Sequence, residues 1–199
     1  MDRHSVESSG EPQLGFLSIT ETLSHGVIGG FLILNRLGHP LEFHCTAPVR
    51  PNKAQEILYG RSLKPFLCGH QIAGALYKRG KAATFALLTD SPYVLSFQEA
   101  LDIPLMMIFP AESTGSEAGE NDAKGGAGLA PLRSLPGIDW EQWREERRGG
   151  LLFAVSKKGE NDPRRESVWE NVALFQKSID LTEPFERIRL AIKESQRGG

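Results

Sequence analysis

The chain has 199 residues, of which 40% are hydrophobic and 24% are charged, and its formal net charge is -2. This length allows one well-buried core, or one medium domain with a small tethered unit, and excludes two large domains. The ordinary composition argues against global disorder, and the near-neutral charge gives no whole-chain electrostatic reason to expect nucleic-acid binding.

The first eleven residues are polar and mixed in charge, and we expect residues 1–11 to be a disordered leader. They hold no apolar stretch of the kind found in a signal peptide. No later apolar run reaches the roughly 20 residues that cross a bilayer. The two cysteines do not make a disulfide framework, which favours a reducing compartment. The sequence therefore predicts a cytoplasmic protein without a membrane anchor.

The clearest strand signals lie in the first quarter of the chain. A first short strand is predicted at residues 14–19. Residues 27–35 are then continuously apolar and residues 41–46 alternate, with a glycine and a proline between the two runs. This pattern predicts a β-hairpin whose first strand is buried on both faces. Gly29 and Gly30 inside that strand suggest a bulge or close backbone packing.

Two helices are predicted after the hairpin. Asn52 is a good N-cap for a short helix through Leu58 that would end at Gly60, and a longer, mostly apolar helix follows at residues 63–79. The remaining elements are a strand at 82–88, a helix at 92–100 and a strand at 104–109. Together these elements form an α+β core that we place at residues 12–110.

A change of composition separates this core from the rest of the chain. Residues 111–128 are rich in Gly, Ala, Ser, Glu and Asp and contain no aromatic residue. They cannot bury enough apolar surface to offset the entropy lost on ordering. We therefore expect a flexible linker or long loop over residues 111–137.

Residues 138–199 are predicted to form a C-terminal α/β segment that packs on the core. Asp139 and Gln142 make a capping-box pattern, which predicts a short helix that bears Trp140 and Trp143. The later elements are a strand at 151–156 and helices at 167–178 and from 182. The whole pattern indicates an α+β fold with a mixed or mainly antiparallel sheet covered by helices.

Both cysteines lie next to histidines in the sequence, in His44-Cys45 and Cys68-Gly69-His70. Zinc needs ligands that converge tetrahedrally at roughly 2.0–2.3 Å. Neighbours on a strand point to opposite faces, and residues two apart on a helix are separated by about 200°. Neither pair converges, so we predict no metal site and no cofactor.

A cysteine-dependent hydrolase or acyl transferase is the catalytic alternative, with Cys45 as nucleophile and His70 as base. Cys45 shares its strand face with Leu41 and Phe43, and Cys68 lies among apolar residues of its helix. Both thiols are therefore expected to be core residues. His70 should be buried or line the wall of a cleft. We favour a protein without catalytic residues and keep the Cys45–His70 enzyme as the alternative.

Positive charge gathers between residues 50 and 81, where the acid Glu56 is the only negative residue. Near the starts of the two predicted helices, four cations would favour an anion or an acidic partner: Arg50, Lys53, Arg61 and Lys64. A solvated rim explains the same residues equally well. Phosphate or nucleic-acid binding through this segment is the second alternative function.

Trp140 and Trp143 are the other candidate binding residues, because a partner could cover the short amphipathic helix that bears them. Docking of the C-terminal segment onto the core is the competing explanation. We predict a non-catalytic cytosolic binding or adaptor subunit of a protein complex. Its expected partner is a protein, nucleic acid is the less favoured partner, and the sequence does not predict an oligomeric state.

Overall fold

The computed structural model describes residues 11–22, 26–109 and 129–197. Its strands are β1 (Leu14–Thr22), β2 (Gly26–Leu34), β3 (Pro40–Cys45), β4 (Ala86–Thr89), β5 (Leu105–Ile108), β6 (Trp143–Arg148) and β7 (Leu151–Ser156). They form one seven-stranded sheet in the order β3-β2-β1-β4-β5-β7-β6, with parallel and antiparallel neighbours. The α+β class with a mixed sheet, predicted from the sequence, is confirmed.

Helices connect and follow the strands. The crossover from β3 to β4 contains α1 (Lys53–Tyr59), the 3-10 turn η1 (Gly60–Ser62), α2 (Leu63–Pro65), the π-helical stretch η2 (Phe66–Ala73) and α3 (Gly74–Arg79). Further 3-10 turns are η3 (Pro92–Ala100), η4 (Ala130–Ser134), η5 (Trp140–Gln142) and η6 (Lys157–Gly159). The last two helices are α4 (Arg165–Gln176) and α5 (Glu183–Arg197). No helix in the described ranges is long and apolar enough to span a membrane.

Three strands at the centre of the sheet share a direction. β1, β2 and β3 form an antiparallel meander, and β4 lies parallel to β1 on its other side. β5 lies parallel to β4, and β7 returns antiparallel to β5. β1, β4 and β5 therefore run in the same direction, and their carboxyl ends point to the same end of the sheet. Open α/β sheets commonly bind ligands outside the carboxyl ends of their strands.

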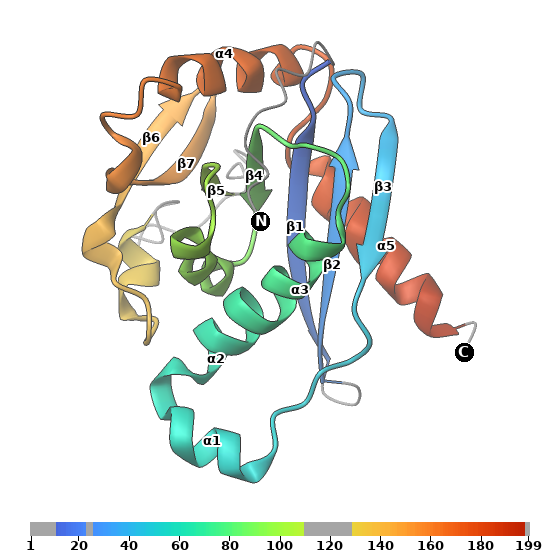
Figure 1. Cartoon of the computed structure of the whole chain (residues 1–199), viewed down its shortest axis with the longest axis vertical. Helices are drawn as coiled ribbons and strands as arrows, with labels where there is room; N and C mark the ends of the chain where they lie inside the picture. The colour runs from blue at the N-terminus through green and yellow to red at the C-terminus, as the bar shows by residue number, and fades with distance from the viewer. Residues whose placement is uncertain (1–10, 23–25, 110–128, 198–199) are drawn as a thin grey trace, which may run out of the picture.

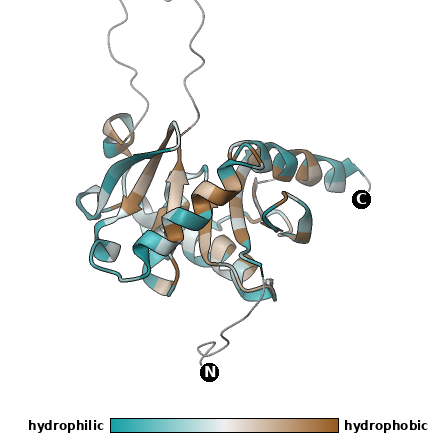
Figure 2. Ribbon diagram, turned by 90° about the horizontal axis from the view of Figure 1, so that it is seen from above, coloured by the Kyte–Doolittle hydropathy of each residue, from teal (hydrophilic) through white to brown (hydrophobic). Residues whose placement is uncertain are grey.

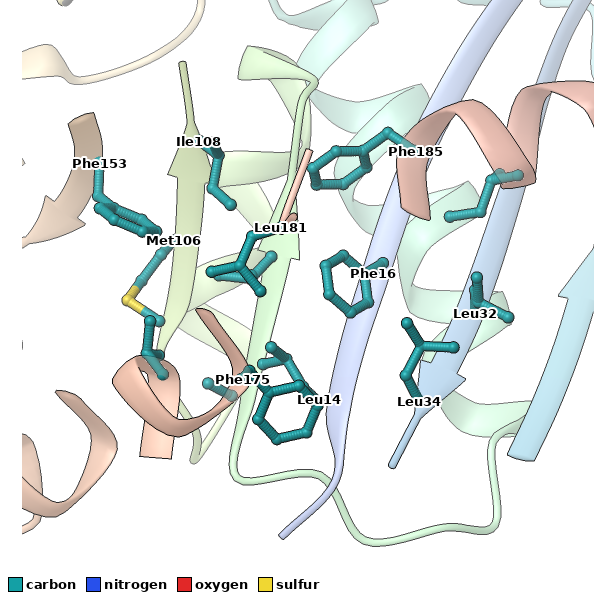
Figure 3. Packing of buried hydrophobic residues seen from close by; sticks show 14 of the residues in the cluster. Leu14, Phe16, Leu32, Leu34, Met106, Ile108, Phe153, Phe175, Leu181 and Phe185 are labelled. Carbon is teal, nitrogen blue, oxygen red and sulfur yellow. The ribbon is translucent and has the colours of Figure 1, made fainter. Parts of the chain in front are cut away.

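Apolar side chains fill both faces of the sheet. α4 and α5 cover one face, where Phe16, Phe153 and Phe175 lie in one cluster (Figure 3). The crossover helices and η3 cover the other face, where Ile72 of the crossover and Leu17 of β1 lie in a second cluster, so α5 and the crossover lie on opposite sides of the strands (Figure 1). Seen from above, the helices alternate hydrophobic and hydrophilic stretches (Figure 2). Burial on both faces explains why the central strands are nearly continuous apolar runs.

Two adjacent glycines on β2 let helices approach both faces of the sheet. A Cβ atom at Gly29 would overlap the side chain of Ile72 and lie 2.9 Å from Leu76 Cδ1 in the crossover. A Cβ atom at Gly30 would overlap Ile188 on α5. Of the two explanations suggested by the sequence, a bulge or close packing, the structure shows close packing.

The helix predicted after Asp139 is confirmed only as the 3-10 turn η5, which Asp139 caps and which bears Trp140, whereas the prediction that Trp143 also lies on this helix is wrong. The chain instead makes the turn η5 and then the strand β6, which pairs antiparallel with β7 along its whole length. Asp139 accepts a hydrogen bond from the backbone N–H of Glu141 at the start of η5. Farther along the chain, Gly149 and Gly150 both have positive φ. This backbone forms a tight hairpin turn, and pairing with the apolar strand β7 prevails over the local helix signal.

The expected linker is only partly within the described residues, because residues 110–128 lie outside them. The expected leader lies outside them too, except for residue 11. From Leu129 onward the chain packs on the core: Leu129 is buried, and Leu132 and Leu135 are half-buried against the cluster on the crossover side. These leucines supply the apolar surface that residues 111–128 lack.

The substitution Gly29→Ala should destabilise the fold, because the new methyl group overlaps Ile72 and forces the crossover helix away from the sheet. We expect a loss of about 1–3 kcal/mol in the free energy of unfolding, measured by urea denaturation. Gly159→Ala is the matched control, since a Cβ atom there meets nothing within 4 Å; its effect should stay within about 0.5 kcal/mol. Equal losses in both variants would contradict the packing role of Gly29.

Candidate functional site

The sheet separates the two cysteines. Cys45 is half-buried against the cluster beneath α5, whereas Cys68 is buried in the cluster on the crossover side. His70 lies on the same crossover as Cys68, and its side chain is exposed. The Cys45–His70 pair considered from the sequence is therefore not formed. Burial raises the pKa of Cys68 to about 12, so this thiol is a poor nucleophile.

His44 is paired with a carboxylate. Its Nε2 lies 2.9 Å from Glu42 Oε2, and the same carboxylate accepts the backbone N–H groups of Lys81 and Ala82 at 3.0 and 2.7 Å. The hydrogen bond with His44 lowers the pKa of Glu42, although burial acts in the opposite direction. Glu42 thus fixes the connection after α3. In the part of the chain that the structure describes, no three His, Cys, Asp or Glu side chains gather around a common metal position.

A groove lies between the crossover and the segment that leads into β6. Its cavity has a volume of about 390 Å³. Much of its wall is aromatic or apolar: Tyr59, Phe66, His70, Ile138 and Trp143. The structure therefore confirms one of the two positions predicted for His70, the wall of a cleft, and not the buried one.

Stacked rings form one wall of this groove. The ring centroids of Tyr59 and Phe66 lie 4.2 Å apart with an interplanar angle of 24°. Trp140 and Trp143 are each only 6% exposed, and Trp140 Nε1 donates a hydrogen bond to the Leu135 carbonyl at 3.2 Å. Both tryptophans dock on the chain's own core, as the competing explanation held, and Trp143 also lines the groove.

A second cavity, also of about 390 Å³, lies beyond the ion pair between Lys158 and Glu99. Lys158 Nζ is 3.3 Å from Glu99 Oε1, and both residues line both cavities. Glu146, on the far wall, accepts hydrogen bonds from Arg148 and Arg165 at 2.7 and 2.6 Å. Burial raises the pKa of Glu146, but these hydrogen bonds outweigh it and the net pKa is lowered. The two cavities lie mainly on opposite faces of the sheet, one against α4 and the other against the crossover, and they share the lining residues Gln98, Glu99, Ser156 and Lys158 near the end of β7.

The helix α1 stands away from the sheet at the lower end of the molecule in Figure 1. Asn52 and Gln55 form a capping box at its N-terminus, which confirms the predicted N-cap. None of its residues is buried, and Ile57 and Leu58 are 71% and 81% exposed. Isolated helices this short are marginal in water, so α1 presents apolar surface without burying any of its own.

The four candidate cations lie around α1 and the neighbouring end of the sheet, but they are not equally free. Acids neutralise two of them: Lys53 pairs with Glu56 at 3.2 Å, and Lys64 pairs with Glu21 at 3.0 Å. Arg50 and Arg61 are exposed and make no ion pair with any residue in the described ranges. The other cations of segment 50–81 lie at the far end of the crossover, after most of α3. The segment is therefore weaker as a polyanion site than its charge count suggests.

Sequence reasoning missed a polar cluster where β4 ends beside β1. Asp90 follows β4, and its Oδ2 accepts hydrogen bonds from Ser18 Oγ at 3.1 Å and from Arg189 on α5. Burial raises the pKa of Asp90, and the hydrogen bonds and charge of its partners offset only part of that effect. Asp90 Oδ1 and Thr20 Oγ1 are buried without a hydrogen-bond partner in the described part of the chain. A polar residue after a predicted strand is a usable signal, but nothing local marks Arg189 as its partner.

The substitution Arg189→Gln should destabilise the fold more at pH 8 than at pH 5. Loss of the guanidinium removes an interaction that lowers the pKa of Asp90, so this already raised pKa rises further. The added cost is absent below the raised pKa that Asp90 has in the folded wild type and complete above its pKa in the folded variant. We expect a loss of about 1–3 kcal/mol at pH 8, measured by urea denaturation at both pH values.

The matched control for this experiment is Arg133→Gln. Arg133 pairs with Glu141, which is 82% exposed, so its loss should change stability by less than about 1 kcal/mol at either pH. A loss for Arg189→Gln that is equal at pH 5 and pH 8 would show that Asp90 ionisation is not involved.

Comparison with known proteins shows no family for this chain. No family model and no curated protein matches it. Among solved structures, human ENDOV is similar over 96% of this chain and 86% of its own, with 12% sequence identity and a TM-score of 0.41. Marinitoga piezophila Argonaute, in complex with 5′ OH guide RNA, is similar over 84% of this chain and 26% of its own, with 11% identity and a TM-score of 0.34. Likeness at this level establishes no relationship, so function must be inferred from the residues of the chain itself.

Proposed function

We propose that this protein is a non-catalytic binding subunit that docks a protein partner on α1 and the adjoining groove. The observation that carries the proposal is the exposure of Ile57 and Leu58, at 71% and 81%, on a helix with no buried residue. Apolar surface presented in this way is typical of interaction sites. A partner that covers these two side chains would remove them from water and stabilise α1.

The charges around α1 indicate the chemistry of the partner. Arg50 and Arg61 flank the helix in sequence, and neither has an ion-pair partner in the described ranges. An acidic segment with apolar side chains matches both features, because carboxylates meet the arginines while apolar groups cover Ile57 and Leu58. The stacked rings of Tyr59 and Phe66 extend the same surface into the groove, and aromatic residues are frequent anchors of interfaces.

The state of the reactive side chains supports binding over catalysis. Cys68 is buried, and burial raises its pKa to about 12. Cys45 and His70 lie on different sides of the sheet, and Asp90 is held by Arg189 and Ser18. Each of these groups is inaccessible, separated from a partner or engaged in a structural interaction.

Replacing both Ile57 and Leu58 by Asp should abolish partner binding and leave the fold intact, because neither side chain is buried. The measurement is affinity capture on the immobilised full chain, with thermal unfolding as the check on folding. Leu190→Asp is the matched control, since Leu190 is 55% exposed on α5. We expect the wild type and the control to retain an acidic protein that the Ile57/Leu58 double variant loses. A second double variant, with Arg50→Glu and Arg61→Glu, should retain less of this protein. Identical retention by all variants would refute the proposal.

Nucleic-acid binding is a second candidate, favoured by the stacked aromatic pair in the groove. Single-strand-binding proteins combine rings that stack on bases with cations that follow the backbone. Tyr59 and Phe66 supply such rings, Lys158 stands at the rim, and Arg61 lies between the two rings in sequence. This arrangement favours single strands over duplexes.

The second candidate is tested by fluorescence anisotropy with a labelled single-stranded oligonucleotide at low and high salt. Tyr59→Ala and Arg61→Glu should each weaken binding about tenfold, within the roughly 1–3 kcal/mol expected for one stacked base. Added salt should weaken the wild type steeply. Lys78→Glu, at the far end of the crossover, is the control. Absence of any anisotropy change with the wild type would reject nucleic-acid binding.

A further inference from the structure

The two edges of the sheet differ in chemistry. Five of the six residues of β6 are charged, which is a common protection against pairing with another strand. β3, at the opposite edge, carries Leu41 and Phe43, which are 44% and 39% exposed. α5 packs on β1 and β2 and leaves these two side chains uncovered. β3 is therefore the less protected edge.

The backbone of β3 has hydrogen-bonding groups that point away from the sheet. Thr46, next to β3, donates its N–H to the Gly29 carbonyl of β2 at 3.0 Å. Because the direction of the backbone N–H and C=O groups alternates along an antiparallel strand, those of His44 also point toward β2. The backbone N–H and C=O groups of Phe43 and Cys45 point outward. In the described ranges no strand lies on that outer side.

We infer that β3 pairs antiparallel with β3 of a second copy of this chain, with a twofold axis at Phe43. This register joins the outward N–H and C=O groups of the two Phe43 residues. It places Glu42 of one copy opposite His44 of the other on one face of the sheet. On the other face it places the two Phe43 side chains side by side at the axis.

The charges favour this register over the adjacent one. The hydrogen bond with His44 lowers the pKa of Glu42, so its carboxylate is charged at neutral pH. Moving the axis to His44 would set the two His44 residues opposite each other. Glu42 of one copy would then no longer lie opposite His44 of the other. A register shift near Leu34 limits regular pairing to the part of β3 from Glu42 onward. The interface is short, and the dimer should depend on protein concentration.

Sedimentation velocity of the full chain over a range of concentrations tests the association. The wild type should form a reversible dimer. Phe43→Lys should weaken it at least tenfold, because two lysines would meet at the axis, whereas Leu190→Lys, at an equally apolar exposed position on α5, should not. A wild type that stays monomeric throughout, or a dimer unaffected by Phe43→Lys, would overturn the inference, which does not depend on the proposed partner.

The substitution Phe43→Cys tests the register. At the axis the two new thiols would lie on Cα atoms about 5.5 Å apart, within the range of a disulfide. Oxidation should give a covalent dimer on a non-reducing gel, and Phe43→Cys with Cys45→Ser should keep it. Leu37→Cys, 59% exposed in the turn before β3, should remain monomeric. A crosslink that requires Cys45, or one formed equally by Leu37→Cys, would overturn the register.

Discussion

The close approach of helices to both faces of β2 is the constraint on which the rest of the structure depends. Because Gly29 and Gly30 carry no side chain, the crossover lies against one face and α5 against the other. The contact at Gly29 positions the part of the crossover that forms one wall of the groove and that follows α1 in the chain. The contact at Gly30 holds Arg189 beside Asp90. Two residues without side chains therefore set the geometry of surfaces well away from them.

The partly buried carboxylates of this protein mainly hold its elements together. Asp90 ties α5 to the sheet, Glu42 ties β3 to the connection after α3, and Glu146 ties β6 to α4. Both carboxylate oxygens of Glu42 and of Glu146 accept hydrogen bonds, whereas Asp90 Oδ1 has no partner in the described part of the chain. Most of the large apolar side chains that stay exposed in the described residues lie on α1 and on β3. The proposed binding role rests on these exposed side chains.

Short-range patterns predicted much of the fold, including the hairpin, the cap at Asn52 and the mixed class of the sheet. Long-range features were not predictable. No local pattern connects Asp90 with Arg189, and none shows on which face of the sheet each cysteine lies. The capping pattern at Asp139 predicts a helix at Trp143, but the glycine turn at 149–150 allows a hairpin that competes with it. His70 lies in a π-helical segment, where hydrogen bonds five residues apart reduce the rotation per residue. The sequence alone therefore does not distinguish the wall of the cleft from the buried side for His70.

The ion pair between Glu99 and Lys158 is a weak part of the border that the two cavities share. Both side chains are about two-thirds exposed, and pairs of this kind contribute less than about 1 kcal/mol. When these long, flexible side chains part, each cavity widens at the border that it shares with the other. The size of a molecule that either cavity admits is therefore set there in part by movable side chains, so each can take ligands of different sizes.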